Sequence, residues 1–405
     1  MTDDIVIVGS SVGGVRTAEA LRRRGFGSRI TLIGAETRSP YDRPPLSKAF
    51  LTGQAAEDDL ALLDGERLDR LELELRLGER AVAVDVGGRQ VRLASGQLVS
   101  FGAVVIATGS LPRRLPALDG WPGVHVLRTL DDALAIRAAL ATGARVVVVG
   151  GGFIGAEVAW SCRALGLEVT IIDPVPALMT RGLGPELGEV LAGRHADHGV
   201  RLRLGRSVAG VEGSGRVERL VLDDGTILDA DVVVVGIGAD PAVGWLAGSG
   251  LPVDGGLCCD AWLRVHGTDS VYAVGDMARW PSSRYAAPLR LEHWTNAGEA
   301  AVAVAAALTG SPAPFDPLPY VWSDQLGTRI QVFGQVRPGD ELVYVEGGPD
   351  GAEFVATSGG DGATQAVVAL SISGDARRAV LRWERLLRSG LPWVDGRGPA
   401  EPVGR

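Results

Sequence analysis

The sequence is poor in lysine and cysteine and contains no long apolar run. Lysine and arginine together number 40, yet Lys48 is the only lysine, so the other 39 are arginine. The three cysteines, Cys162, Cys258 and Cys259, are odd in number and form no C-x-x-C pair. This pattern argues against a disulfide framework and favours a cytoplasmic protein.

Features of exported, membrane and nucleic-acid-binding proteins are also missing. The N-terminus MTDDIVIVG lacks a basic start, and glycine or charge interrupts every apolar stretch, so neither a signal peptide nor a membrane span is expected. The net charge is −9 without a run of like charge, which argues against nucleic acid or an anionic membrane as partner. A content of 46% hydrophobic and 22% charged residues predicts a globular chain, and 405 residues predict two or three domains.

The same plan of strand, glycine turn, helix and strand occurs twice. Its parts are 4–9, 15–26 and 29–36 in the first copy and 145–150, 156–166 and 168–173 in the second. Each copy predicts parallel strands joined by right-handed crossovers. Both copies continue with an alternating stretch, 81–100 and 206–230, which predicts a three-stranded meander. The predicted fold class is therefore α/β, with two Rossmann-like dinucleotide-binding domains.

The pattern of apolar and polar residues changes near residue 319. Several alternating stretches that follow are typical of antiparallel strands, and 377–390 is typical of a helix. These patterns predict a separate C-terminal α+β domain. The tail 396–405 is rich in glycine and proline and is expected to be mobile.

The second copy carries the clearer glycine turn. Gly150, Gly152 and Gly155 match G-x-G-x-x-G between a strand and a helix, where backbone and the helix N-terminus can hold a pyrophosphate. Asp173 ends the next strand, 18 residues after the last glycine, where an acid binds a ribose 2′-hydroxyl. An acid repels a 2′-phosphate, so NADH is favoured over NADPH. Ile154 in the turn is a further candidate contact; a turn without a ligand is the alternative.

The first copy departs from this pattern at one position. Gly9, Ser11 and Gly14 occupy the three places, so serine replaces the second glycine. Serine fits if its φ is negative, and its hydroxyl can then donate to the phosphate; the alternative is that this half binds no dinucleotide. Glu36 lies 22 residues after Gly14, just past the second strand, and favours a binding site here.

Seven strings resemble those of one family. In chain order they are YDRPPLSKAFL, VVIATGS, GGGFIGAEVA, VGIGADP, VYAVGD, EHWTNA and PYVWSDQLG. Together they resemble the FAD-dependent, NADH-using ferredoxin reductases of bacterial cytochrome P450 and Rieske oxygenase systems, of the putidaredoxin reductase type. The resemblance covers essentially the whole chain. RPPLSK, EHWTNA and WSDQ are its specific parts, because disulfide reductases share the glycine turns and the ATG string.

This resemblance implies a layout of three domains and two cofactors. The FAD domain would be discontinuous and comprise 1–113 and 241–318. The NADH domain, 114–240, would be inserted into it, and the α+β domain, 319–405, would follow. The two nucleotide domains would be arranged as in glutathione reductase. FAD and NADH are the implied cofactors, and no metal is expected.

The resemblance also assigns residues to FAD. Asp276 in YAVGD would hydrogen-bond the ribityl chain, and Thr108 and Gly109 in ATGS would bring backbone close to the cofactor. Arg43 and Pro44 would line its adenine and ribose side. The alternatives are ordinary turns after core strands for Asp276, Thr108 and Gly109, and a solvated loop residue for Arg43.

Lys48 and Glu157 are implied to face each other beside the flavin. Glu157 begins the helix after the second glycine turn, where an acid would in any case favour the helix dipole. In the family, the matching glutamate faces the lysine of the L-S-K string. This predicts a Lys48–Glu157 ion pair near flavin N5 that joins two domains. A compact ammonium differs there from a planar guanidinium, which gives the single lysine a reason.

Two tryptophans and two further residues complete the implied cofactor contacts. Trp322 would cover one face of the isoalloxazine ring, Trp294 would lie close by, and Glu292 would sit near the nicotinamide. Structural tryptophans are the alternative, since the chain contains nine. Gly238, in VGIGADP, is a candidate contact in the second copy.

The cysteine content bears on the route of the electrons. Disulfide reductases pass electrons to a cysteine pair beside the flavin, whereas Cys258 and Cys259 lie outside the flavin-contacting strings. The main hypothesis is that NADH gives a hydride to flavin N5 and that single electrons leave for a [2Fe–2S] or similar ferredoxin. Ferredoxins are usually acidic, so Arg290, Arg329 and Arg337 are candidates for a docking patch.

Two alternative functions remain open at this point. One is an NADH-dependent rubredoxin reductase or NADH oxidase. The other is a redox-sensing flavoprotein that resembles apoptosis-inducing factor, although the sequence has no evident targeting segment. A monomer or weak homodimer is expected, without nucleic-acid or membrane partners.

Overall fold

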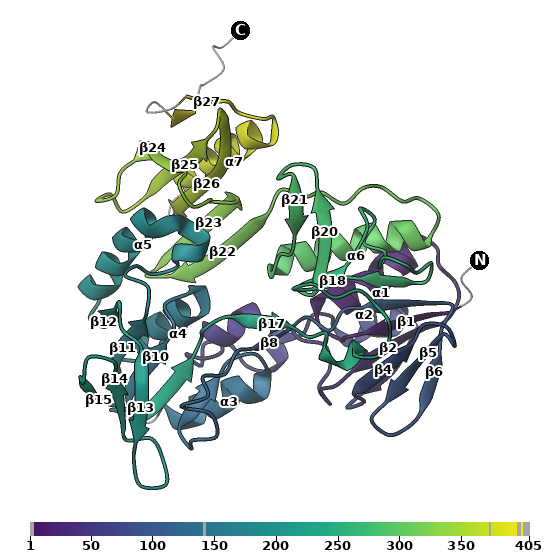
Figure 1. Cartoon of the computed structure of the whole chain (residues 1–405), viewed down its shortest axis with the longest axis horizontal. Helices are drawn as coiled ribbons and strands as arrows, with labels where there is room; N and C mark the ends of the chain where they lie inside the picture. The colour runs from purple at the N-terminus through teal and green to yellow at the C-terminus, as the bar shows by residue number, and fades with distance from the viewer. Residues whose placement is uncertain (1–3, 141–142, 372–373, 395–397, 400–405) are drawn as a thin grey trace. The chain divides into compact units, whose positions relative to one another are not determined.

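The computed structural model describes residues 4–140, 143–371, 374–394 and 398–399 of the chain (Figure 1). The chain divides into two compact units. The first unit comprises Met1–Asp42, Glu57–Leu111 and Ala239–Pro317. The second unit comprises Arg43–Ala56, Pro112–Gly238 and Leu318–Arg405. Both units are discontinuous in sequence, so residues far apart along the chain share one core.

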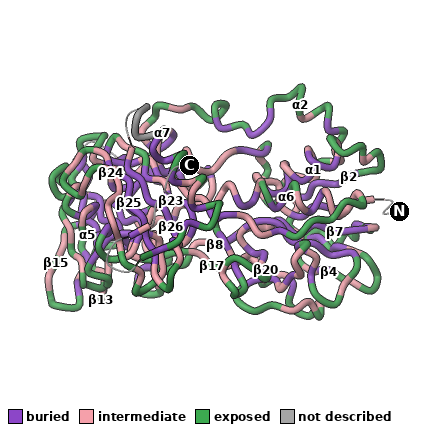
Figure 2. The backbone as a smooth tube through the Cα atoms, turned by 90° about the horizontal axis from the view of Figure 1, so that it is seen from above, coloured by how far each residue is buried: buried purple, intermediate pink, exposed green. Residues whose placement is uncertain are grey.

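The first unit is built on a five-stranded parallel sheet. Its strands, in spatial order, are β19 (Val271–Ala273), β7 (Ala103–Ile106), β1 (Ile5–Val8), β2 (Ile30–Gly34) and β3 (Leu73–Leu77). Runs such as IVIV and AVVI are nearly all apolar because both faces of these strands are covered, and Figure 2 shows β7 as a buried stretch. Helices α1 (Val12–Arg23) and α6 (Trp294–Leu308) pack against each other and contribute to the same core.

Smaller elements complete the first unit. The predicted meander is present as β4 (Ala81–Asp85), β5 (Gln90–Leu93) and β6 (Leu98–Ser100). The other elements are short: η2 (Asp58–Leu60), α2 (Gly65–Arg70), η3 (Gly244–Leu246), the pair β8 (Ser110–Pro112) and β17 (Ala239–Pro241), and the sheet of β18 (Leu257–Cys258), β20 (Ala278–Ser282) and β21 (Ala287–Leu289).

The second unit repeats the parallel sheet. The strands, in spatial order, are β12 (Val200–Leu204), β11 (Glu168–Asp173), β10 (Arg145–Val149), β16 (Val232–Val235) and β9 (Val124–Val126). Its helices are α3 (Leu130–Ala139), α4 (Phe153–Ala164) and α5 (Thr180–Asp197). The second predicted meander is confirmed as β13 (Val208–Glu212), β14 (Arg219–Leu222) and β15 (Ile227–Asp229).

The segment that contains Lys48 packs within the second unit. It begins with the short helix η1 (Pro44–Ser47), which contacts α3 and α4. Leu51 belongs to the same apolar core as the buried residues of α4, and the Arg137 guanidinium lies 4.8 Å from the centre of the Phe50 ring. These contacts fix the segment Arg43–Ala56 on α3 and α4 of the second unit.

A five-stranded antiparallel sheet forms the C-terminal part of the second unit. Its spatial order is β22 (Tyr320–Gln325), β23 (Thr328–Gly334), β26 (Ala363–Ser371), β25 (Phe354–Gly360) and β24 (Glu341–Gly347); α7 (Gly374–Arg388), β27 (Trp393–Val394) and β28 (Gly398–Pro399) complete it. Side chains alternate between its faces: Val368 and Leu370 join the core that contains α4 and α5, whereas Val367 and Ala369 join the α7 core. The sheet is therefore a middle layer within the unit.

The predicted fold class is confirmed: two parallel sheets of the Rossmann type are followed by an α+β part. Of the tail for which mobility is expected, only 398–399 are among the described residues. Within the described part of the chain, every helix is too short or too polar to cross a membrane.

Candidate functional site

The first glycine of each turn is required by the backbone. Gly9 has φ +120° and Gly150 has φ +111°, a region that side chains rarely adopt. A Cβ on Gly9 would lie 2.1 Å from the carbonyl oxygen of Ala107, and one on Gly150 would lie 2.3 Å from that of Gly236. Both turns therefore pass against the backbone that follows the neighbouring parallel strand, β7 or β16.

The third glycine of each turn is required by packing. A Cβ on Gly14 would lie 1.9 Å from the carbonyl oxygen of Gly9, and a Cβ on Gly155 would lie 1.9 Å from that of Gly150. The first turn of the helix thus presses directly on the residue that ends the strand. The two turns match each other to within a few tenths of an ångström in these contacts.

The second position differs between the turns in residue but not in conformation. Ser11 has φ −91° and ψ −167°, and Gly152 has φ −74° and ψ −177°. The φ of Ser11 is negative, as expected for a serine that fits at this position of the turn. A Cβ on Gly152 would meet no atom within 4 Å, so this glycine is not explained by packing inside the protein.

The residues at both turns fit a bound dinucleotide phosphate. No side chain caps α1 or α4, and neither helix carries an acid in its first turn. By contrast, Thr129 and Asp132 form a capping box on α3, and Asp64 caps α2. The first turns of α1 and α4 thus lack the local acid that α2 and α3 have, and a helix end of this kind can bind a phosphate.

The predicted ribose-binding acids lie at the ends of the second strands. Asp173 ends β11 and accepts hydrogen bonds from the backbone N–H of Gly151 at 2.6 Å and of Val175 at 2.8 Å. Glu36 follows β2 and accepts a hydrogen bond of 2.5 Å from the Tyr41 hydroxyl. Asp173 is consequently held beside its glycine turn, as a ribose ligand must be.

In the first unit, the predicted FAD residues follow neighbouring strands of the parallel sheet. Thr108 and Gly109 follow β7, and the Thr108 hydroxyl donates to the carbonyl of Ala242 at 2.9 Å. Asp276 follows β19 and accepts a hydrogen bond of 2.6 Å from the Ser110 hydroxyl. Since β19, β7 and β1 are adjacent, these residues and the first glycine turn share the carboxyl edge of one sheet, where such folds bind ligands.

Two further predicted residues of the first unit are fixed by polar partners. Trp294 begins α6, and its indole N–H donates to Asp42 at 2.6 Å. Glu292 accepts a charge-assisted hydrogen bond of 2.5 Å from Arg290, which also donates to the backbone oxygen of Asp276 at 3.0 Å. Arg290 therefore ties Glu292 to the Asp276 segment.

The predicted Lys48–Glu157 ion pair is confirmed. The Lys48 ammonium lies 2.7 Å from Glu157 Oε2, and the two side chains are 18% and 3% exposed. Lys48 also donates to the carbonyl of Pro44 at 3.0 Å. Both partners belong to the second unit, so the ion pair is internal to one compact unit, whereas the sequence suggested a pair that joins two domains.

Glu157 has further partners that the sequence did not predict. Ser47 Oγ donates to its Oε2 at 2.5 Å, and Ser323 Oγ donates to its Oε1 at 2.6 Å. Ser323 lies inside the family-like string WSDQ, so that string contained the only signal for this contact. Ser47, which precedes Lys48, likewise lies inside a family-like string, RPPLSK.

The remaining predicted residues of the second unit lie in several places. Arg43 donates to the carbonyl of Arg128 at 2.5 Å, and Trp322 stacks on Tyr320 with ring centres 6.0 Å apart. Ile154 is exposed at the start of α4, and Gly238, with φ +101°, follows β16. Ile154 and Gly238 lie on the same edge of the parallel sheet as Gly150, whereas Trp322 lies on the C-terminal sheet.

All three cysteines are free. Burial raises the pKa of the Cys162 and Cys259 thiols to about 12, which leaves them as thiols at neutral pH. Cys258 is partly buried and adjacent to Cys259. Reactive cysteines need an accessible thiolate, so neither buried thiol is suited to relay electrons.

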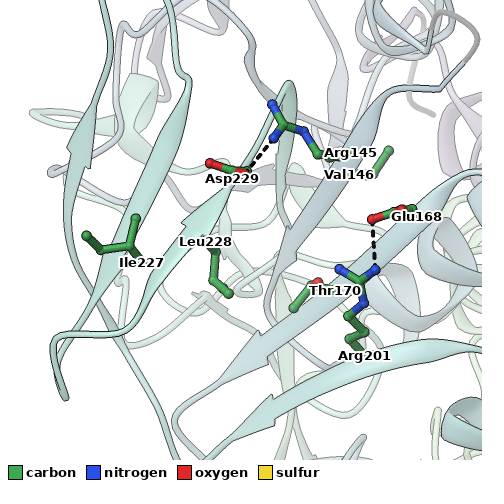
Figure 3. A pocket seen from close by; sticks show the side chains of 8 residues that line it. All are labelled: Arg145, Val146, Glu168, Thr170, Arg201, Ile227, Leu228 and Asp229. Carbon is green, nitrogen blue, oxygen red and sulfur yellow. Dashed lines mark hydrogen bonds and ion pairs between the residues drawn. The ribbon is translucent and has the colours of Figure 1, made fainter.

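A polar cavity of about 250 Å³ lies at the opposite edge of the second parallel sheet (Figure 3). It is lined at the amino ends of β10, β11 and β12 and by β15. Two ion pairs cross its wall, Arg145–Asp229 at 2.7 Å and Arg201–Glu168 at 2.8 Å. Its charges are thus already paired, and it is separate from the glycine turn at the carboxyl ends.

Among the candidate docking arginines, Arg290 and Arg329 form side-chain ion pairs with acids of the chain. Arg290 pairs with Glu292, and Arg329 pairs with Asp324 at 2.6 Å. The backbone N–H of Arg337 donates to Asp340. Arg290 belongs to the first unit and the other two to the second, so a shared docking face stays a prediction.

Comparison with known proteins gives consistent relatives. The chain is 38% identical over 377 residues to the chlorobenzene dioxygenase ferredoxin reductase component of Cupriavidus sp. (strain PS12), which covers 93% of this chain and 91% of that protein. It is 36% identical over 352 residues to rhodocoxin reductase of Rhodococcus erythropolis, which covers 86% and 82%. A solved covalent complex of putidaredoxin reductase with putidaredoxin matches with a TM-score of 0.91 and 32% identity over 96% of this chain and 94% of that one.

These relatives confirm the resemblance to ferredoxin reductases that the sequence strings indicated. The family model described as pyridine nucleotide-disulphide oxidoreductase matches residues 3–301, which include both glycine turns and the Lys48–Glu157 pair. The chain therefore belongs to the pyridine nucleotide-disulphide oxidoreductase family.

Proposed function

We propose that this chain is an NADH-dependent, FAD-containing reductase that passes electrons to a [2Fe–2S] or similar ferredoxin, which feeds a cytochrome P450 or a Rieske oxygenase. The observation that carries the proposal is the buried Lys48–Glu157 ion pair, with 2.7 Å between the ammonium and the carboxylate. Glu157 lies two residues after the last glycine of the second turn. The names of the relatives support the acceptor, since one is the ferredoxin reductase component of a dioxygenase. The buried, protonated thiols argue against transfer through a cysteine pair.

The family uses FAD and NAD(H), and each glycine turn offers a place for one of them. In the first unit, the turn from Gly9 to Gly14 would hold FAD together with Thr108 and Asp276. In the second unit, the turn from Gly150 to Gly155 would hold NADH, with Asp173 as the acceptor for the ribose hydroxyls. Ser11 has the same extended backbone as Gly152, which supports its place in such a cradle.

The protein contributes position and charge to this reaction. When bound, FAD supplies the acceptor for the hydride of NADH and gives up the two electrons one at a time. Lys48 presents a compact positive charge, and Glu157 holds that charge in place while keeping the pair electrically neutral. Because both side chains are largely buried, their interaction is screened less by water and salt than a surface pair would be.

Three finer features belong to the same proposal. The three-domain layout predicted from the sequence remains our proposal, although Arg43–Ala56 packs with the second unit. We also propose a cytoplasmic location, which suits free thiols and NADH as the electron source. A monomer or weak homodimer is our expectation for the oligomeric state.

The direct test is NADH-dependent reduction of cytochrome c with and without an added ferredoxin. We expect strong stimulation by at least one ferredoxin of an oxygenase system and a clear preference for NADH over NADPH. A lack of stimulation by every ferredoxin in a panel, together with rapid consumption of oxygen, would instead identify an NADH oxidase.

A further inference from the structure

A buried chain of hydrogen bonds leads from the ion pair into the second unit. Ser323 Oγ donates to Glu157 at 2.6 Å, and the Gln325 side-chain nitrogen lies 2.9 Å from Ser323 Oγ. The Gln325 side-chain oxygen lies 2.7 Å from His195 Nε2. Lys48, at the other end, is joined through Glu157. Five side chains, from α4, α5, β22 and the residue that follows η1, thus form one connected series.

The direction of each bond in the series is fixed by chemistry. A carboxylate only accepts, so Ser323 must spend its single hydroxyl proton on Glu157. Ser323 can then only accept from Gln325, whose amide nitrogen must face it and whose oxygen must face the ring of His195. Burial lowers the pKa of His195 below its usual 6.5, which favours the neutral ring. The Gln325 oxygen can only accept, so the proton of the neutral ring is assigned to Nε2. Every donor therefore points toward Glu157.

The members beyond Glu157 are fully enclosed. Ser323, Gln325 and His195 are each at most 1% exposed, among apolar residues of the core that α4, α5 and the C-terminal sheet share. Apolar side chains would fill that space without the cost of burying polar groups. The Nδ1 atom of His195 has no partner, so the end of the series is not optimised for stability. These groups need a reason other than packing.

We propose that Ser323, Gln325 and His195 are positioning residues that hold the Glu157 carboxylate, and through it the Lys48 ammonium, in the single orientation used in the reaction with NADH. This rests on the proposed function, because the reaction is the reduction of bound flavin. Glu157 is fastened at Oε1 by Ser323 and at Oε2 by Ser47 and Lys48, so rotation of the carboxylate would break bonds on both oxygens. Ser323 alone engages Oε1 in this set, and Gln325 fixes which way its hydroxyl points.

The single lysine provides a probe of the pair that needs no substitution. Protein grown on lysine labelled with ¹³C at Cε contains one labelled residue, Lys48, in the full-length holoenzyme. Its Cε resonance reports the surroundings of the ammonium whether or not any ferredoxin is reduced. The same preparation can be mixed rapidly with NADH to follow the loss of flavin absorbance.

The matched variants are Ser323→Ala and Ser358→Ala. Both replace a buried serine of the C-terminal sheet whose hydroxyl donates to a carboxylate, but Ser358 donates to Asp340 at 3.0 Å and does not touch Glu157. We expect Ser323→Ala to shift and broaden the Lys48 resonance and to slow flavin reduction at saturating NADH about tenfold, with little change in the Kd for NADH. Gln325→Leu should act in the same direction more weakly, and Ser358→Ala should change neither readout.

Thermal unfolding of each variant separates positioning from general damage. The proposal is overturned if Ser323→Ala leaves the resonance and the reduction rate unchanged, or if Ser358→Ala alters both equally. If Ser323→Ala does not fold, Gln325→Leu decides by the same two readouts. Failure of the proposed acceptor would look different, because NADH would still reduce the flavin in the unsubstituted protein while no ferredoxin reoxidised it.

Discussion

The two glycine turns begin α1 and α4 in the same way, but the helices carry side chains of opposite charge at the same position after the turn. Two residues after the third glycine stands Arg16 in α1 and Glu157 in α4. Arg16 is 28% exposed and pairs with Glu19 of its own helix at 2.5 Å. Glu157 is 3% exposed and paired with Lys48. Because α1 forms with a surface arginine at this position, the turn does not need an acid there, and the buried acid is better explained by the site.

The three positions of each glycine turn also differ in what determines the residue. The backbone determines the first and third positions, whereas the middle position faces a ligand. At the first and third positions of both copies, an added Cβ would lie only 1.9 to 2.3 Å from a backbone oxygen, so glycine is required there. The middle position is serine in one copy and glycine in the other, with nearly the same φ and ψ. The copies thus share what the fold requires and differ where a cofactor would approach.

The largest expected effect is the loss of stability when the third glycine, which both turns share, is replaced. Gly14→Ala and Gly155→Ala should each destabilise the protein by about 3 kcal/mol or more, because the new Cβ would overlap a backbone oxygen that cannot move aside. Urea unfolding measures this. Gly193→Ala in α5 is the control, since its Cβ would meet nothing within 4 Å and alanine favours a helix. Equal stability of Gly155→Ala and Gly193→Ala would refute the account of the turns.

The next effect tests the difference between the helices. Glu157→Ala should cost about 2 to 3 kcal/mol of unfolding free energy, because it leaves the Lys48 ammonium and two hydroxyls without their acceptor. Arg16→Ala removes a partly exposed pair and should change stability by less than about 0.5 kcal/mol. Chemical unfolding of both variants makes the comparison, and similar losses in the two would contradict it.

A smaller effect is expected at the lysine itself. Lys48→Arg keeps the charge but places a planar guanidinium in a site that is 18% exposed, where the ammonium also donates to the Pro44 carbonyl. We expect FAD to remain bound and flavin reduction by NADH to slow about tenfold, equivalent to about 1.4 kcal/mol. Stopped-flow absorbance at the flavin maximum measures it. An unchanged rate would make the single lysine an accident of composition.

Exchanging the middle residues sharpens the comparison further. Gly152→Ser should fold normally, since space is open there and φ is negative, but should raise the Kd for NADH several-fold because a Cβ now stands where the phosphate approaches. Ser11→Gly should retain FAD with a stability change of less than about 1 kcal/mol. Equilibrium titration with NADH and the flavin content after gel filtration are the readouts; unchanged NADH affinity in Gly152→Ser would count against the cradle.

The smallest effect concerns acid stability in the second unit. Hydrogen bonds from Arg145 lower the pKa of Asp231 from 3.8 to about 2. A depressed carboxyl pKa stabilises the fold above pH 4, and this contribution is lost as pH falls from about 4 to about 2. The Asp231 side chain is 40% exposed, so the effect should stay below about 1 kcal/mol. Asp231→Asn should flatten the pH dependence of urea unfolding in that window, and an identical profile would exclude this role.

Local pattern predicted much of the fold, and contacts over long sequence distances account for what it missed. Strand β11 matches its predicted range 168–173, because a short apolar run rich in β-branched residues and bounded by turns favours a strand over a helix. Helix α4 begins at Phe153, three residues before the predicted start, because its first turn is also the glycine turn. The partners Ser47 and Ser323 reach Glu157 from 110 and 166 residues away, which no periodicity encodes.

The ion pair and its hydrogen-bond partners also could not be predicted from local sequence pattern. Lys48 and Glu157 came from strings resembling a family, and the observed ion pair agrees with that resemblance. Nothing local marks His195, which sits in a helix whose path bends at Gly184 and contains Pro185. A buried histidine in such a helix acquires its partner only when the C-terminal sheet packs against it.

We conclude that electrons pass from NADH through this chain to a ferredoxin. Double-mixing stopped-flow without oxygen tests it most directly: NADH is mixed with the holoenzyme, and an oxidised [2Fe–2S] ferredoxin is added once the flavin absorbance has been lost. We expect flavin absorbance to return in two one-electron phases as the ferredoxin is reduced. Flavin that stays reduced with every ferredoxin tried, but is reoxidised quickly by oxygen, would contradict it.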